Sequence, residues 1–281
     1  VVVTPATGTS TTVPIAFGVE FSGPVQGFDA ADVVLGGTAG ASGVTVTGSG
    51  ASYVATVADA QRAGTVTAQV VALAATRYGL ANGASNVAST TFAPPRPSAT
   101  VEQSAAQSDP TPDPVATFDV TFSEPVTGLD AADLVVGGTA GATQVSLSGS
   151  GAAYVATVTG AVRPGTITLA LGEAAATSRF GEASLAATST DAEVSFDPGT
   201  PALAIERASG QDAITTSDEV AFAATFSQPV TGFDVDDVVL GGTTGGTVTV
   251  TGSGADYAIV VSGLERAGEV SVSVPAEAAT S

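Results

Sequence analysis

Three identically spaced pairs of aspartates are the clearest candidates for chemistry in this sequence. Two residues separate the members of each pair, and the pairs are Asp29 and Asp32, Asp130 and Asp133, and Asp234 and Asp237. Paired carboxylates could bind Ca²⁺, which takes about six to eight oxygen ligands. Alternatively, the first aspartate caps a one-turn segment by accepting hydrogen bonds from backbone amides. Because two carboxylates fall short of a calcium cage, we expect capping, with Asp236 making the third pair the best exception.

A second set of carboxylates lies near two proline-rich stretches, 92–98 and 196–201, which we interpret as connectors between domains. These acids are Glu102, Asp109, Asp113, Asp197, Glu206 and Asp212. If they meet at domain junctions, they could bind structural calcium and stiffen the chain. The alternative is that they are exposed loop charges. A ligand bound only by the native state raises the melting temperature, so millimolar calcium separates the two hypotheses.

The sequence lacks the residues that most catalytic devices need. It contains no His, Cys, Met or Trp, and its seven basic residues are all Arg, so Ser-His-Asp, Ser-Lys and thiol nucleophiles are excluded. Carboxylate pairs of the glycosidase type remain available, but four Tyr without Trp offer little sugar stacking. The glycines of 36–40 lack a following helix and a lysine, so they predict a turn and not a phosphate cradle. We therefore expect no enzyme and assign no catalytic, cofactor-binding or metal-binding residue.

The aspartate pairs recur because a longer stretch is repeated. Copies of Phe-Ser-x-Pro-Val-x-Gly-Φ-Asp, where Φ is Phe or Leu, begin at Phe21, Phe122 and Phe226, about 100 residues apart. This length corresponds to one small domain. We predict domains at residues 1–93, 94–197 and 198–281. The third lacks the counterpart of residues 179–196, so its last strand is missing; either a continuation of the chain supplies that strand, or another copy does so by donor-strand complementation.

Within each repeat the apolar residues alternate with polar ones, which is typical of half-buried strands. In 115–122, for example, Phe118, Val120 and Phe122 share one face. A Gly-Ser-Gly turn precedes Tyr53, Tyr154 and Tyr257, whose rings we expect to be buried with their hydroxyls bonded to backbone or water. About seven such strands per repeat, with no convincing helix, predict an all-β fold of tandem immunoglobulin-like β-sandwiches arranged as an elongated rod.

Composition limits the partners. The 27 acidic and seven basic residues give a net charge of −20, which disfavours nucleic acid and anionic membranes. No apolar run is long enough to span a bilayer, so we expect no membrane insertion in this segment. A start at Val1 without a signal peptide and a stop inside the third repeat suggest a piece of a longer exported polypeptide.

The repeated motifs resemble the bacterial immunoglobulin-like tandem repeats of large secreted adhesins and surface proteins. In the second copy the resemblance runs through 101–111, 118–128, Gly137-Gly-Thr-Ala-Gly141, Ser148-Gly-Ser-Gly151 and Gly165-Thr-Ile-Thr168. Members often carry an Asp-x-x-Gly-Asn-like loop before the last strand. Here the corresponding places read Thr76-Arg-Tyr-Gly79 and Thr177-Ser-Arg-Phe-Gly181, which departs from that pattern.

The resemblance implies an extracellular spacer segment, an adhesin-like stalk whose partners are other domains of the same longer polypeptide. Two alternatives stay open. One is a subunit of a self-assembling filament, sheath or S-layer, which binds copies of itself. The other is a glycan- or protein-binding adhesin module, which requires loop chemistry unique to one copy, and Asp236 and Tyr78 are the main candidates. An accessory segment of a larger exported enzyme is a further option.

Overall fold

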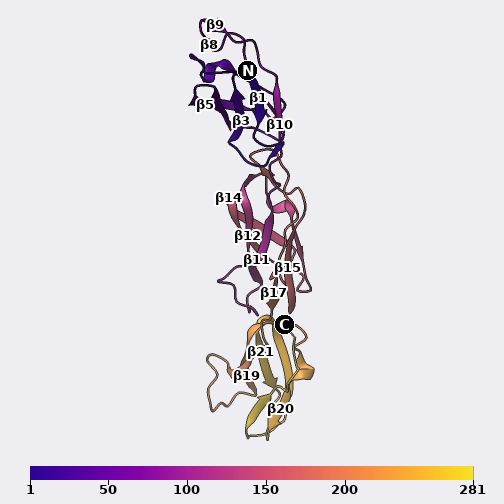
Figure 1. Cartoon of the computed structure of the whole chain (residues 1–281). Coiled ribbons are helices and arrows are strands. Elements are labelled where there is room, and N and C mark those ends of the chain that lie inside the picture. The colour runs from indigo at the N-terminus through magenta and orange to yellow at the C-terminus, as the bar shows by residue number, and fades with distance from the viewer. Residues whose placement is uncertain (281) are drawn as a thin grey trace. The chain divides into compact units, whose positions relative to one another are not determined.

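The structure is a computed structural model that describes residues 1–280, and these residues form an all-β protein (Figure 1). The predicted fold class is confirmed at this level. Apart from strands, the described chain contains three one-turn 3₁₀ helices. None of these helices is long and apolar enough to cross a membrane. Contacts divide the chain into two compact units, Val1–Asp197 and Pro198–Ser281.

Residues 1–93 contain two four-stranded sheets, in the orders β1-β3-β6-β5 and β2-β10-β7-β4. The strands of the first sheet are β1 (Val2–Pro5), β3 (Ile15–Glu20), β6 (Ser52–Asp59) and β5 (Ser42–Ser49). Those of the second are β2 (Thr9–Ser10), β10 (Ala88–Phe92), β7 (Gly64–Val70) and β4 (Val33–Gly36). A separate two-residue hairpin pairs β8 (Thr76–Arg77) with β9 (Leu80–Ala81).

Residues 94–197 repeat this plan with a four-stranded and a three-stranded sheet. The first follows the order β11-β12-β14 and adds β16 beside β12; the second follows β13-β15-β17. Their bounds are β11 (Ala99–Gln103), β12 (Val115–Thr127), β14 (Gln144–Thr159), β16 (Thr177–Ser178), β13 (Leu134–Gly137), β15 (Gly165–Leu171) and β17 (Glu193–Phe196).

The second unit has a three-stranded sheet, β18-β19-β21, and a two-stranded sheet, β20-β22. The bounds are β18 (Leu203–Arg207), β19 (Glu219–Val230), β21 (Thr247–Ser262), β20 (Val239–Gly242) and β22 (Val270–Ser273). Five strands therefore lie in 198–280, against seven in 94–197 and ten in 1–93. The expected number of seven strands per repeat is found only in the middle copy. The first copy has more because its two-residue strands β2, β8 and β9 are counted separately.

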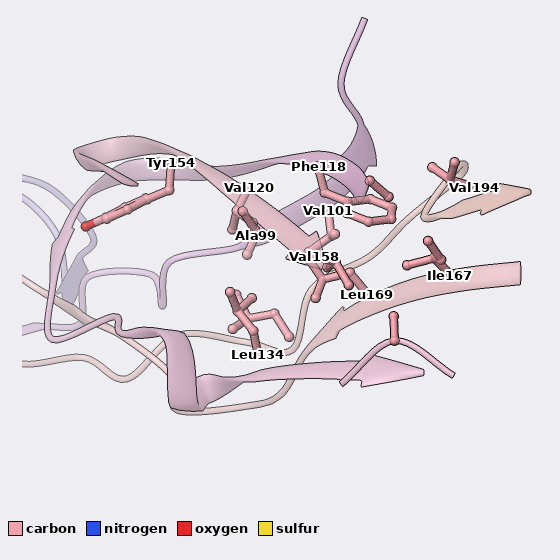
Figure 2. Close-up of a cluster of buried hydrophobic side chains, with 14 of the residues drawn as sticks. Ala99, Val101, Phe118, Val120, Leu134, Tyr154, Val158, Ile167, Leu169 and Val194 are labelled. Carbon is pink, nitrogen blue, oxygen red and sulfur yellow. The ribbon is translucent and has the colours of Figure 1, made fainter. Parts of the chain in front are cut away.

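The predicted alternation is confirmed on β12, where Phe118, Val120 and Phe122 are all buried. Successive side chains of a strand point to opposite faces, so this alternation gives the sheet one apolar face. Figure 2 shows that face opposite Ile167 and Leu169 of the other sheet. The buried cluster joins residues of both sheets, so this part of the chain has the layering of a β-sandwich. Similar clusters lie within 3–92, where Phe180 also packs, and within 203–279.

The Gly-Ser-Gly segments reverse the chain as predicted. In the first copy the reversal separates β5 from β6 at Gly50, whose φ is +69°. In the second copy, both arms of the reversal belong to one strand, β14. The Ser148 hydroxyl donates to the carbonyl of Val155 at 3.4 Å. Seven residues of straight strand would span about 23 Å, so β14 folds back on itself here.

The prolines of Phe-Ser-x-Pro-Val lie where pairing is interrupted. The register between β12 and β14 shifts between Thr121 and Val126, and the register between β19 and β21 shifts between Thr225 and Val230. Proline has no backbone N–H and cannot donate to a neighbouring strand, so a bulge accommodates it. The valine that follows the proline, Val126 or Val230, accepts a hydrogen bond from the hydroxyl of the repeated tyrosine.

Candidate functional site

The three aspartate pairs form capping boxes, which confirms the structural interpretation. Asp29 accepts a hydrogen bond from the Ala31 amide at 2.8 Å, and its own amide donates to Asp32 Oδ2 at 2.9 Å. The equivalent bonds start the 3₁₀ helices Ala131–Asp133 and Val235–Asp237. The reciprocal bond to the second aspartate is a feature that our sequence analysis did not include, although it follows from the three-residue spacing.

These bonds occupy the carboxylates that a cation would need. In the third copy, the extra acid Asp236 donates its backbone amide to Asp234 Oδ1 at 2.9 Å. Among residues 1–280, no group of three or more His, Cys, Asp or Glu side chains lies close enough together to hold a metal ion. The arrangement is suited to fixing the entry of the chain into β4, β13 and β20, since each helix leads directly into one of these strands.

The repeated tyrosines pack against phenylalanines at the bulge. Tyr257 contacts Phe226 and Phe233 in edge-to-face geometry, with ring centroids 5.9 and 5.0 Å apart. Its hydroxyl donates to the carbonyl of Val230 at 3.2 Å. Tyr154 makes the same bond to Val126 at 3.5 Å. The expectation of a buried ring with a backbone-bonded hydroxyl is confirmed for Tyr154, whose ring Figure 2 shows beside the core. The Tyr257 hydroxyl is bonded as expected, but its ring is half-buried.

The acids near the connectors make hydrogen bonds to local backbone. Glu102 accepts from the amides of Thr190 and Asp191, at 3.0 and 2.7 Å, and from the Thr190 hydroxyl. The Thr190 amide is the main cause that lowers the pKa of Glu102 below its ordinary value; partial desolvation opposes it, and the Asp191 amide and Thr190 hydroxyl lower it further. The carboxylate thereby fastens the segment 188–191 along the outer edge of β11.

The other connector acids do not join Glu102 in one cluster. Asp109 Oδ1 accepts from the Ser195 amide at 2.9 Å, and the backbone amides of Asp113 and Asp197 donate to Thr111. Glu206 and Asp212 belong to the second unit. Within the first unit, Glu102 and Asp109 thus hold two different parts of the segment 190–195, which is a structural use of their charge.

The glycine-rich segments form turns, as predicted. A side chain at Gly37 would collide with the backbone of Thr65, and the φ of Gly37 is +95°, so this position requires glycine. The carbonyl of the next residue, Thr38, accepts from Arg62 Nε at 3.0 Å. Arg163 and Arg266 make the same bond in the other copies, to the carbonyls of Thr139 and Thr243. Three of the seven arginines therefore serve one repeated structural role.

The connector between the two sandwich-like parts of the first unit is fixed at both ends. Residues 93–98 have no regular secondary structure, as expected for this proline-rich stretch. The Ala93 amide donates to Ser10, the carbonyl of Pro97 accepts from Leu185, and Ser98 exchanges backbone and side-chain bonds with Ser123. Pro94 and Pro97 are buried. The stretch is therefore a packed part of the first unit.

Arg96 ties this connector to the loop before β17. Its Nε and one terminal nitrogen donate to the carbonyls of Ala183 and Ser184, both at 2.7 Å. The same guanidinium pairs with Glu173 at 2.7 Å, and the Arg96 side chain is 35% exposed. A planar guanidinium with several fixed donors is suited to such a set of acceptors.

The tip of that loop inserts an aromatic ring into the preceding part of the chain. Phe180 packs edge to face against Phe92, with centroids 5.1 Å apart, and joins the apolar cluster of residues 3–92. Arg179 lies over the Phe180 ring at 4.0 Å and pairs with Asp59 at 3.3 Å. Side chains from both sandwich-like parts of the first unit therefore meet at this junction, which we call the junction cluster: Asp59, Phe92, Arg96, Glu173, Arg179 and Phe180.

No local sequence pattern identifies the junction cluster. From the sequence alone, Thr177-Ser-Arg-Phe-Gly181 is visible only as a departure from a family pattern. The corresponding loop of the first copy carries Arg77 and Tyr78, but Tyr78 is 91% exposed. A signal was available, since two of only seven arginines, Arg96 and Arg179, belong to this cluster.

Comparison with known proteins adds no identification: no protein-family model matches the chain, and no curated protein matches it in sequence.

Proposed function

We propose that this chain is a non-enzymatic spacer segment of an extracellular bacterial surface protein, built from three tandem immunoglobulin-like sandwiches. The single observation that carries the proposal is the junction cluster. A spacer must transmit position from one domain to the next, and relative motion is the default for domains that touch only lightly. The connector bonds, the Arg96 contacts and the inserted Phe180 ring restrict that motion within the first unit.

The charge distribution supports the same function. At least five of the seven arginines make hydrogen bonds or ion pairs with this chain: Arg62, Arg96, Arg163, Arg179 and Arg266. Most of the 27 acidic residues have no cationic partner to balance them. A net charge of −20 keeps neighbouring chains apart at a crowded surface and keeps them soluble.

Duplication of one repeat tests the proposal. We would insert a second copy of residues 94–197 after Asp197 in the full chain and measure the maximum dimension by small-angle X-ray scattering. A spacer should lengthen by about 30–40 Å, the diameter of a compact domain of this size. The matched control is a Gly/Ser insert of equal residue count, which should broaden the distribution of dimensions without adding a defined length.

The original chain and the chain with the duplicated repeat also test the surface role. An epitope displayed on bacteria by the duplicated chain should lie farther from a membrane dye, by energy transfer, than an epitope on the original chain. An unchanged dimension in solution, or equal distances on cells, would contradict a spacer function.

A further inference from the structure

One stretch of every repeat carries no charge. Charged residues make up 12% of the chain, yet none occurs in residues 33–58, 134–162 or 238–255. Each stretch begins directly after a capping box and contains an edge strand of the second sheet (β4, β13 or β20) and the strand that follows it. We call these three stretches the neutral flanks.

Each neutral flank also contains an open edge of the first sheet. In the first copy this edge is β5, the last strand in the order β1-β3-β6-β5, and among residues 1–280 no strand pairs with its outer side. In the other copies the same place belongs to the first arms of β14 and β21, residues 144–149 and 247–252, because β12 and β19 pair only with the second arms. The open edge therefore occurs in all three copies, including the middle copy with its seven strands.

The opposite edge of the same sheet is covered in the first two copies. The Asn86 side chain accepts from the Val3 amide at 2.9 Å and donates to the Val3 carbonyl at 2.8 Å. In the middle copy the Val101 amide donates to the carbonyl of Thr188 at 3.2 Å, and the Thr188 amide donates to Ala99 at 3.0 Å. Proteins usually cover or charge an edge strand, because its unpaired backbone groups are a template for pairing with another chain. This chain protects one edge and leaves the other with neither cover nor charge.

The side chains of the open edge are suited to strand pairing. In β5, and in the arms 144–149 and 247–252, exposed hydroxyl residues alternate with half-buried aliphatic ones. The aliphatic side chains face the core, and a strand added to this edge would cover them further. The adjoining strand β4, which contacts β5, has an exposed valine at the same position in every copy. These residues are Val34, Val135 and Val239, with exposed fractions of 52%, 62% and 55%.

We infer that the neutral flank binds the same flank of a second copy of this chain, with the two open edge strands pairing antiparallel across a two-fold axis. Charge selects this occupant. Copies with a net charge of −20 repel one another, and the repulsion is weakest where both surfaces lack charge. A cationic partner would instead be attracted to the carboxylates, all of which lie outside the neutral flanks. The inference does not depend on the spacer proposal, since a spacer can work singly or in pairs.

Sedimentation velocity of the full chain over a series of concentrations tests the association. We expect a concentration-dependent dimer that is more stable at about 0.5 M than at about 0.05 M NaCl, because salt screens the repulsion between the acidic surfaces. A dimer that weakens as salt is added would be held by opposite charges, and that result would overturn the inference.

An edge variant locates the contact. Thr45→Asp, Ser146→Asp and Thr249→Asp together place one carboxylate in the middle of each open edge strand, at positions that are exposed in the single chain. Like charges brought together across paired strands are destabilising. The dissociation constant of the dimer should therefore rise at least about tenfold.

A control variant separates the position of the charges from their number. Thr4→Asp, Thr100→Asp and Ala204→Asp together add the same three charges at exposed positions of β1, β11 and β18, away from the open edge. This variant should form the dimer much as the parent chain does. Equal weakening by both variants would show that net charge alone governs association, which would overturn the inference.

Hydrogen exchange on the unaltered chain gives a second measurement that does not rely on the variants folding. Backbone amides within 42–49, 144–149 and 247–252 should exchange more slowly in the dimer than in the monomer, because pairing occupies their open edge. Slowing confined to residues outside the neutral flanks, or a chain that stays monomeric at every concentration and salt, would overturn the inference. A monomeric chain could still lengthen when residues 94–197 are duplicated, so the spacer proposal is tested separately.

Discussion

The ring of Phe180 meets the ring of Phe92 edge to face, 5.1 Å from centroid to centroid, so one loop tip shares the core of the preceding repeat. The corresponding ring in the first copy, Tyr78, is 91% exposed. Two equivalent sequence positions therefore have different energetic roles, and this contrast leads to the first prediction.

Phe180→Ala should lower the free energy of unfolding of the first unit by about 1–2 kcal/mol, because a half-buried ring loses its apolar contacts. Tyr78→Ala is the matched control and should change stability by no more than about 0.5 kcal/mol. Urea titrations of the full chain, monitored by circular dichroism, measure both. Equal effects of the two substitutions would show that the Phe180 contact adds no stability.

The capping boxes give a second matched pair. Asp234→Ala should destabilise the second unit by about 1 kcal/mol, because the Asp236 amide loses its acceptor at the start of the 3₁₀ helix. Asp236→Ala changes a neighbouring carboxylate that makes no capping bond, and should be neutral within about 0.5 kcal/mol. Thermal unfolding of the two variants tests this difference. A larger loss for Asp236→Ala would contradict the capping role.

The hydrogen bonds to Glu102 predict a dependence on pH. Its folded-state pKa is lowered from the ordinary value of 4.5, so the folded state binds a proton less readily than the unfolded state. The stability that Glu102 contributes is therefore fully present above pH 4.5 and is lost as the pH falls through the lowered pKa. Glu102→Gln should remove this part of the acid sensitivity, and melting temperatures between neutral pH and pH 3 measure it. Superimposable pH profiles of the variant and the parent would refute the prediction.

Calcium should leave the melting temperature unchanged. The oxygens of Glu102 and Asp109 already accept backbone hydrogen bonds, as do those of the capping aspartates. A ligand that binds the native state raises the melting temperature, so scanning calorimetry with millimolar CaCl₂ against EDTA is a direct test. Magnesium at equal ionic strength controls for general screening of the acidic surface. A rise specific to calcium would restore the metal hypothesis for the connector acids.

Much of the fold follows from local sequence pattern. The alternation over 115–122 predicts a strand, and β12 begins at Val115 as this pattern requires, because side chains alternate across a strand with a period of two. The capping role of Asp29 follows in the same way, since donor and acceptor lie within three residues of each other. Because the sequence is repeated, the same strand and cap predictions apply to the equivalent residues of the other copies.

The contacts of the junction cluster could not be predicted from local sequence pattern. Arg96 meets Ser184 across 88 residues, and no local pattern indicates which carbonyls its guanidinium reaches. The sequence showed that residues 177–181 depart from the family pattern, but it did not show that Phe180 packs against Phe92.

The sequence by itself determined the repeat, the alternation that makes each strand half-buried, and the turns and caps that join the strands. These depend on residues a few positions apart, whose geometry the backbone fixes. Only the tertiary structure decided that Phe180 packs in a core while Tyr78 remains in solvent, and that Arg96 meets the carbonyls of Ala183 and Ser184. Those outcomes depend on which distant segments occupy the neighbouring space, and that occupancy is a property of the folded chain.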